Sequence, residues 1–106
     1  MILESVCGLS EAIQSKILKV LSEYRSIKEV VLYGSRAKGH FKTGSDIDLT
    51  IKSDAISHET LLKLENDLDD LMLPYKIDLS LYHEIENPNL IDHIERVGLV
   101  FYRRCP

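Results

Sequence analysis

The stretch GSRAKGHFKTGSDIDLTI, residues 34–51, decides the fold class of this 106-residue chain. It opens with a glycine and a serine, continues through basic residues, and ends in a segment that alternates polar and apolar side chains. Such alternation indicates a β-strand with one buried face. Asp46 and Asp48 share the polar face, and Ile47 and Leu49 share the apolar one. The stretch therefore predicts a strand that carries two neighbouring carboxylates.

Helical and strand patterns alternate on both sides of this stretch. An apolar stripe at helical spacing before it, and another after it, are typical of helices packed on a core. The expected elements are a helix capped by Ser10, a strand at 29–33, a short helix after Gly34 and Ser35, a strand at 46–52, a helix from Ser57 to before Pro74, a strand at 75–82, a helix from Asn87 to Gly98, and a strand at 99–102. This alternation predicts one α/β domain over residues 1–106. It does not predict the strand order.

Composition and charge exclude several classes of protein. The net charge of -4 argues against direct binding of nucleic acid, which depends on clustered basic residues. No apolar run approaches the length of a membrane span, and the N-terminal residues do not resemble a signal peptide. Cys7 and Cys105 have no partner at metal-ligand spacing and are interpreted as structural or incidental thiols. We therefore expect a cytoplasmic protein with no membrane contact.

The two carboxylates on one strand face indicate a cation. Asp46 and Asp48 repel each other unless protons or cations lie between them. Mg²⁺ suits them, because it takes hard oxygen ligands and keeps positions for substrate phosphates. Asp78 lies on the polar face of the strand expected at 75–82, and pairing of the two strands would bring it beside Asp48. We expect the three aspartates to converge.

The residues before the carboxylates indicate a phosphate site. Gly34 lets the backbone approach a ligand closely, and the free N–H groups at the start of the expected short helix, with the Ser35 hydroxyl, would face an anion. The segment that follows is basic within an acidic protein, and its basic residues are Arg36, Lys38, His40 and Lys42. This local reversal of charge suits a triphosphate.

Two competing motifs fail on spacing. A Walker A loop starting at Gly34 would have His40 at the lysine position and Phe41 at the magnesium-binding hydroxyl. A calcium loop starting at Asp46 would have Ile51 at the glycine position. A Gly-Ser pair or an Asp-x-Asp triplet alone is a weak signal, so the order of the whole set carries the interpretation.

That order resembles the minimal nucleotidyltransferases of the DNA polymerase β superfamily. Their signature is Gly-Ser, ten residues, then Asp-x-Asp, as at Gly34-Ser35 and Asp46-Ile47-Asp48 here, with a further aspartate in a later strand, as in LPYKIDL. The resemblance implies a small mixed β-sheet flanked by helices. It also implies transfer of a nucleoside monophosphate from a nucleoside triphosphate, with release of pyrophosphate and use of two Mg²⁺ ions.

The resemblance also assigns roles to residues. Asp46 and Asp48 would bind the metals, and Asp78 would bind the catalytic metal and help to activate the acceptor. The residues that would contact the nucleotide are Gly34, Ser35, Arg36, Lys38 and Ser45. His58, His83 and His93 are interpreted as surface or structural residues, and Tyr33 and Tyr75 as packing residues that are also candidates for the nucleotide pocket.

The acceptor is open at this stage. Stand-alone members that resemble this chain are antitoxins that pair with a small helical HEPN-type protein, which implies transfer of AMP from ATP to a tyrosine hydroxyl of that partner. A non-catalytic module that neutralises its partner by binding is an alternative. A second alternative is transfer to a small molecule such as an aminoglycoside bound between two subunits, attracted by the acidic residues Glu65, Asp67, Asp69 and Asp70, although these also suit a solvated helix face. A homo-oligomer is a further possible assembly.

Overall fold

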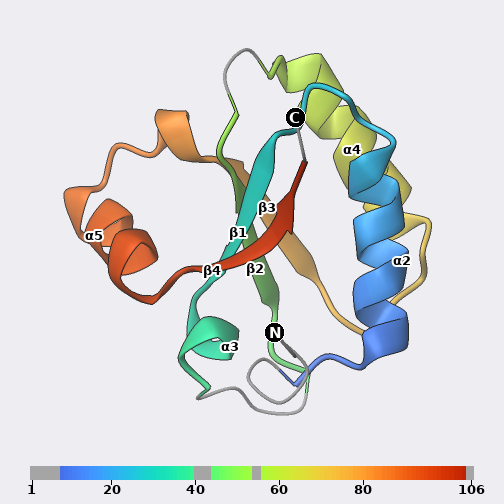
Figure 1. Ribbon diagram of the computed structural model, residues 1–106, viewed down its shortest axis with the longest axis horizontal. Helices are drawn as coiled ribbons and strands as arrows, with labels where there is room; N and C mark the ends of the chain where they lie inside the picture. The colour runs from blue at the N-terminus through green and yellow to red at the C-terminus, as the bar shows by residue number, and fades with distance from the viewer. Residues whose placement is uncertain (1–7, 40–43, 54–55, 105–106) are drawn as a thin grey trace.

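The computed structural model describes residues 8–39, 44–53 and 56–104 (Figure 1). The elements follow the predicted order: α2 (Glu11–Ser22), β1 (Glu29–Tyr33), α3 (Ser35–Lys38), β2 (Ile47–Ile51), α4 (His58–Asp69), β3 (Ile77–Leu81), the 3-10 helix η1 (Tyr82–Glu84), α5 (Pro88–Val97) and β4 (Leu99–Arg103). Among them only η1 has no counterpart in the sequence prediction. It takes the last residue of the strand expected at 75–82.

The four strands form one mixed sheet in the order β3-β2-β1-β4. The strand β1 pairs antiparallel with both β2 and β4, whereas β2 and β3 run parallel. A parallel pair needs a long crossover, and α4 supplies it between β2 and β3. The mixed sheet flanked by helices is confirmed.

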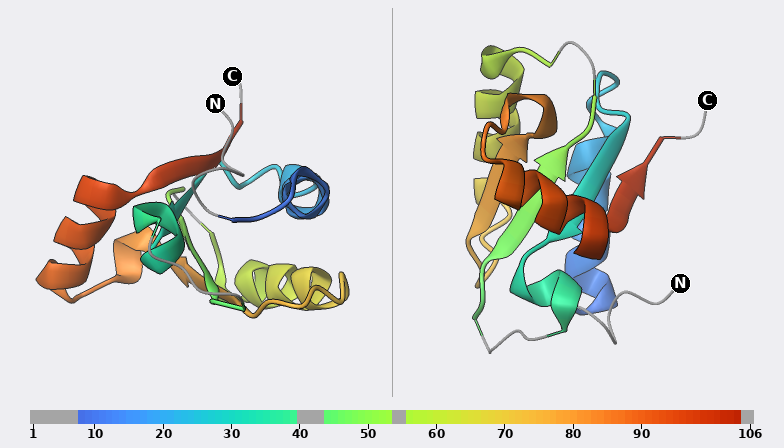
Figure 2. Two further views of the ribbon diagram at one scale, coloured as in Figure 1. Left: turned by 90° about the horizontal axis from the view of Figure 1, so that it is seen from below. Right: turned by 90° about the vertical axis from the view of Figure 1, so that its left-hand side faces the viewer.

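The apolar side chains of β2 face a core that α2 and α4 cover. These two helices lie side by side on one face of the sheet, α5 lies on the other, and α3 lies at the end of the sheet where β1 ends (Figure 2). The core residues with no exposed surface are Leu9, Ile17, Leu21, Ile27, Val30, Leu32, Ile47, Leu49, Ile51 and Leu64. Full burial of one such side chain contributes about 1.5–3 kcal/mol. The fold is therefore stabilised mainly from the face opposite the carboxylates.

The helix α5 covers part of the other face. Its Ile94 packs with Val31 and Tyr33 of β1 in a second, smaller apolar cluster. At its solvent side, Glu95 accepts hydrogen bonds from Lys52 at 2.7 Å and from the Tyr82 hydroxyl at 3.0 Å. On this face, Asp46 before β2 and Asp78 at the start of β3 remain exposed.

The helix caps follow the sequence prediction. Ser10, Ser57 and Asn87 accept backbone N–H groups in the first turns of α2, α4 and α5. Gly98 ends α5 as expected, but its backbone is extended rather than left-handed. A Cβ at Gly98 would meet the Ile94 carbonyl oxygen at 2.4 Å, so a close approach to the helix explains this glycine.

The helix expected from Ser57 to before Pro74 ends sooner, at Asp69, so that Leu71 lies beyond it. Tyr24 likewise lies beyond the end of α2 at Ser22, and both side chains pack against the core. Among the described residues, no helix is long and apolar enough to cross a membrane. Cys7 and Cys105 lie outside the described residues.

Candidate active site

The predicted site residues gather at one end of the sheet, where β1 ends and β2 and β3 begin. The register places Tyr33, the last residue of β1, opposite Asp48 of β2. On the other side of β2, Asp48 lies opposite Asp78 of the parallel strand β3. The predicted pairing of these two aspartates is confirmed, because both occupy the second position of strands that run in the same direction.

Gly34 makes the turn between β1 and α3 directly over Asp48. Its φ of 79° and ψ of -157° fall in a region that is essentially restricted to glycine. A Cβ at this position would meet the Asp48 Oδ2 atom at 2.3 Å. The backbone therefore leaves no room for a side chain between Gly34 and this carboxylate, and no side chain caps the first turn of α3. Ser35 begins that turn.

The three carboxylates differ in environment. Asp46 and Asp78 are exposed, whereas Asp48 is partly buried. Burial raises the pKa of Asp48, and the negative charges of Asp78 and then Asp46 raise it further. The carboxylates are thus close enough to repel one another, and a cation between them would relieve that repulsion.

The three carboxylates are suitable ligands for a hard cation, but their side chains are not grouped around one position. Carboxylate oxygens are the ligands that Mg²⁺ prefers. Among the described residues, no three histidine, cysteine, aspartate or glutamate side chains lie close enough together to hold a metal ion as they stand. The backbone brings Asp48 and Asp78 together, and the side chains of Asp46 and Asp78 are exposed and have room to turn toward a bound ion.

Arg36 lies in the interior rather than in the open site. Its side chain is 2% exposed, and its Nε and Nη2 atoms donate to the Ser45 carbonyl oxygen at 3.0 and 2.9 Å. The guanidinium also lies 4.7 Å from the centre of the Tyr75 ring. Arg36 therefore ties α3 to the residue just before Asp46. A direct contact of Arg36 with the nucleotide stays a prediction.

The remaining basic residues of the motif are placed only in part. Lys38 ends α3 with an exposed side chain. His40 and Lys42 lie outside the described residues. Lys76 has an exposed side chain two residues before Asp78, on the outward side that the alternation over residues 75–82 predicts.

His93 is a site neighbour that sequence reasoning missed. From α5, its Nε2 atom accepts the Gly34 N–H at 3.1 Å, and its ring meets the Tyr33 ring edge-on with centroids 6.3 Å apart. The two residues are 59 positions apart, so no local pattern links them. His93 holds the glycine turn from the side of the sheet that α5 covers.

Hydroxyl groups line the same strand face behind the carboxylates. The Ser80 hydroxyl donates to Thr50 Oγ1 at 3.0 Å. Burial raises the pKa of Tyr33, with a hydrogen bond to Ser80 opposing the shift. Thr50 has no exposed surface, because this part of the polar face is covered rather than open as the alternation suggested. Tyr33 therefore packs with Val31 and Ile94 and forms a hydrogen bond with Ser80.

The geometry joins a glycine turn, three carboxylates and a short basic helix at one end of a mixed sheet. Residues 15–105 match the family model described as polymerase beta, nucleotidyltransferase. The chain belongs to the polymerase β nucleotidyltransferase family. The match spans β1 to β4, and so covers all the predicted site residues of this nucleotidyltransferase.

A curated relative of this nucleotidyltransferase comes from Methanocaldococcus jannaschii. It is named "putative protein adenylyltransferase" and is 40% identical over 78 residues, which are 73% of this chain and 79% of the relative. A second protein of the same organism with the same kind of name is 38% identical over an equal share.

Solved structures share the fold at lower identity. A toxin-antitoxin structure with AMP-PNP has a TM-score of 0.68 at 20% identity, covering 86% of this chain and 73% of the other. A complex of tri-AMPylated Shewanella oneidensis HEPN toxin with an MNT antitoxin has a TM-score of 0.66 at 17% identity, covering 91% and 74%. These similarities show the fold of the nucleotidyltransferase.

Proposed function

We propose that this nucleotidyltransferase transfers AMP from ATP to a hydroxyl group of a partner protein. The observation that carries the proposal is the register of Asp48 with Asp78, directly under the Gly34 turn, in a member of this family. The curated relative at 40% identity, named as a protein adenylyltransferase, supports a protein as the acceptor. The AMP-PNP in the toxin-antitoxin structure supports an adenine nucleotide.

Asp46, Asp48 and Asp78 would hold two Mg²⁺ ions. When bound, Mg²⁺ supplies positive charge beside the reacting phosphate and lowers the pKa of the acceptor hydroxyl. The pKa of Asp48 is already raised by burial and by Asp78 and Asp46, so the site favours a species that neutralises its carboxylates. The two Mg²⁺ ions would supply the positive charge that these carboxylates need.

The phosphates would lie against the Gly34 turn. Ser35 offers its hydroxyl and the first-turn N–H of α3, and Lys38 offers an exposed charge at the end of the same short helix. Ser45 is held against Arg36 next to the carboxylates, so its position depends on that contact. The chain thus orients the triphosphate between the α3 turn and the start of β2.

The reaction is a substitution at the α-phosphorus. The acceptor oxygen forms a bond to this phosphorus, and the bond from it to the oxygen that bridges to the β-phosphate breaks. Pyrophosphate leaves with that electron pair, and the acceptor proton passes to Asp78 and then to water. Positioning and charge stabilisation supply most of the rate, because the protein forms no covalent bond itself.

A HEPN-type protein is the proposed partner. The chain has the fold found in structures of HEPN toxins bound to MNT antitoxins, one of which contains a tri-AMPylated toxin. A tyrosine of such a partner would supply the hydroxyl. In this role the chain would act in the cytoplasm as an antitoxin that modifies its toxin.

The test uses ATP labelled at the α-phosphate. The purified protein is incubated with Mg²⁺, labelled ATP and lysate of its host, and the products are separated on a denaturing gel. We expect label on one discrete protein of the size of a HEPN-type protein. The Asp46→Asn, Asp48→Asn double variant should give no label, and the control Asp92→Asn, at an exposed carboxylate paired with Arg96 on α5, should label as the wild type does.

Other outcomes distinguish the alternatives. Label that survives in the double variant would contradict the proposed chemistry. A toxin still neutralised by the double variant would identify a binding module. Transfer of labelled AMP to an added aminoglycoside, with no labelled protein, would identify a small-molecule acceptor.

A further inference from the structure

We infer that the outer edge of β3 is the docking strand for the acceptor, which binds as an extended peptide segment with basic residues next to its reactive hydroxyl residue. This inference rests on the proposed function and names how the acceptor reaches the site. It concerns a surface next to the carboxylates, formed by β3, α4 and the chain between them.

The strand β3 is a free edge of the sheet in the described part of the chain. It stands last in the strand order, with β2 on its inner side. The Lys76 carbonyl accepts from the Ile47 N–H on that inner side at 2.8 Å. Backbone groups of alternate residues in a parallel ladder point to opposite sides, so those of Ile77 and Leu79 point outward. Such an edge is a template for an added strand.

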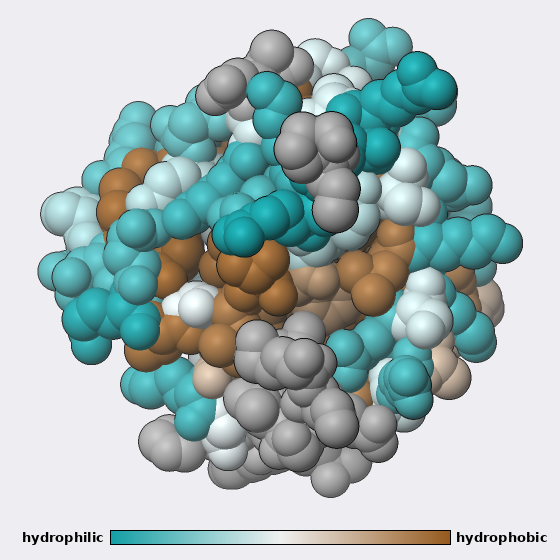
Figure 3. Space-filling view, viewed as in Figure 1, coloured by the Kyte–Doolittle hydropathy of each residue, from teal (hydrophilic) through white to brown (hydrophobic). Residues whose placement is uncertain are grey.

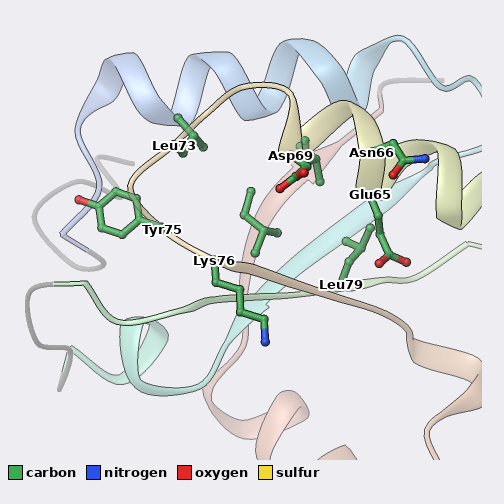
Figure 4. A pocket seen from close by; sticks show the side chains of 9 residues that line it. Glu65, Asn66, Asp69, Leu73, Tyr75, Lys76 and Leu79 are labelled. Carbon is green, nitrogen blue, oxygen red and sulfur yellow. The ribbon is translucent and has the colours of Figure 1, made fainter.

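Beside this edge the surface is hollowed into a pocket of about 290 Å³ between α4 and β3. Figure 4 shows Glu65, Asn66 and Asp69 of α4 on one side of β3. Partly exposed apolar side chains form its floor, among them Ile77 and Leu79. The acidic groups on the rim and the apolar floor fit the aliphatic stem and positive head of a lysine or arginine.

Lys76 also lines this pocket, and its amino group extends away from the acidic groups of α4 (Figure 4). Asp78 lies on the same side of the strand as Lys76, since it lies two residues further along β3. The edge of β3 therefore separates an acidic, apolar pocket on the α4 side from the reactive carboxylates on the other. Any extended segment paired with β3 would meet both.

Side chains alternate between the two sides of a strand, so the position of each acceptor residue determines which side of β3 it would face. A residue paired opposite Asp78 presents its side chain on the side of the carboxylates, so its hydroxyl would lie beside the group that accepts its proton. The residues immediately before and after it present their side chains to the pocket. Basic residues at these two positions would face Glu65 and Asp69.

The opposite edge of the sheet does not serve this purpose. Apolar side chains gather around β4 on the face shown in Figure 3, where Val100 is 39% exposed. This edge and β3 lie at the two ends of the strand order, with β1 and β2 between them. A segment bound at β4 would be separated from Asp78 by the width of the sheet.

The test compares binding and transfer with two short synthetic peptides of equal length. Each contains one tyrosine, flanked on both sides by lysine in one peptide and by glutamate in the other. Binding is followed by amide chemical shifts in a ¹⁵N-labelled protein with Mg²⁺ and a non-hydrolysable ATP analogue. Transfer is followed with labelled ATP. We expect the lysine peptide to shift the Ile77 and Leu79 amides, and the glutamate peptide to bind about tenfold more weakly.

Two variants test the assignment of the pocket. Glu65→Lys should weaken binding of the lysine peptide about tenfold, while leaving the affinity for the ATP analogue unchanged. Glu86→Lys, which makes the same charge change at an exposed residue outside the pocket, should leave peptide binding unchanged. A lysine peptide N-methylated at its backbone amides should lose the β3 shifts, because it cannot pair with the edge.

The two readouts separate the docking strand from the reaction. Labelling of tyrosine without shifts in β3, or equal binding of both peptides, would overturn the docking strand and leave the proposed function standing. Binding at β3 without labelling would support the docking strand and contradict transfer to tyrosine. Absence of peptide binding would also overturn the docking strand. So would shifts of the β3 amides that depend only on protein concentration, because these would indicate a second copy of the chain on this edge.

Discussion

At Gly34 the backbone passes so close to Asp48 that a methyl group would meet the carboxylate oxygen at 2.3 Å. The glycine serves two purposes there, since its ψ of -157° at positive φ also excludes other residues. The turn that would hold phosphates and the carboxylate that would hold metal therefore share one small volume. A change at either residue affects the position of the other.

Gly34→Ala should destabilise the fold by about 1–3 kcal/mol and abolish nucleotidyl transfer. The cost combines backbone strain with displacement of Asp48. Urea denaturation measures the stability, and the labelling assay measures the activity. Gly44→Ala is the matched control, because Gly44 also has positive φ, at 84°, but a methyl group added there would meet no atom within 4 Å.

A double-mutant cycle sharpens this prediction. Asp48→Ala in the Gly34→Ala background removes the carboxylate that the new methyl group would meet, so part of the lost stability should return. Equal costs for the two glycine substitutions, with no recovery in the double variant, would show that the contact with Asp48 has no energetic weight.

Asp48→Asn should abolish transfer and yet raise the melting temperature of the metal-free protein at neutral pH. The pKa of Asp48 is raised in the folded state, mainly by burial. The folded protein therefore binds this proton more readily than the unfolded chain, and stability falls as pH rises from the ordinary pKa of 3.8 through the raised value. The amide carries no charge and avoids this loss.

Thermal unfolding at several pH values without Mg²⁺ measures the effect. The variant should exceed the wild type at pH 7, and the difference should vanish below pH 3.8, where the wild-type carboxyl is protonated in both states. A wild type that is equally stable or more stable at pH 7 would contradict the raised pKa of Asp48.

At the level of elements, α5 connects the site to the rest of the sheet. His93 holds the Gly34 N–H, Ile94 packs in the cluster with Tyr33, and Glu95 binds Lys52 and Tyr82. Three successive residues of one helix thus contact β1, the glycine turn and the end of β2. The position of α5 therefore determines the position of the turn.

His93→Phe should raise the KM for ATP about tenfold with a smaller change in kcat. Phenylalanine keeps a ring against Tyr33 but leaves the Gly34 N–H without its acceptor, and loss of one partner of a partly buried hydrogen bond costs about 1–3 kcal/mol. Steady-state kinetics separates the two constants. His93→Gln, which restores an acceptor, should recover part of the loss.

The control for this prediction is His83→Phe, at an exposed position of η1. It should leave both constants unchanged. If His93 had only a structural role, both His93 variants would have a lower melting temperature. The molecules that remain folded would then have the wild-type KM for ATP.

The elements were predictable because each depends on a local pattern. The period of two in β2 and β3 gave the faces of Asp48 and Asp78, and three polar caps gave the starts of the long helices. The spacing of the Gly-Ser pair and the Asp-x-Asp triplet gave the site. Strand order was not predictable, because β4 follows β3 in the chain but pairs with β1 at the opposite edge of the sheet.

The contacts of Arg36 and His93 were not predictable either. A basic residue in a basic segment indicates a solvated or ligand-binding charge, but Arg36 is buried because the Ser45 carbonyl and the Tyr75 ring receive its guanidinium. His93 is a lone histidine on an amphipathic helix, and its partner is fixed only when α5 packs on β1. Both contacts arise from tertiary packing.

Over the whole molecule, stability depends on the sheet as a continuous layer from β3 to β4. Phe101→Ala should cost about 3–5 kcal/mol, because Phe101 is 5% exposed and joins the edge strand β4 to the core at a point where its register with β1 shifts. Chemical denaturation measures this loss. Val100→Ala, at a neighbouring residue that is 39% exposed, is the control and should cost well under half as much.

The two faces of the sheet serve separate purposes, and this has an evolutionary consequence. Leu49 and Ile51 anchor the core from one side of β2, while Asp48 faces the other side. Selection for folding therefore acts on a set of residues that selection for catalysis does not use. A lineage can lose its aspartates in single steps and still inherit a folded protein, so inactive descendants of this enzyme should arise readily and persist.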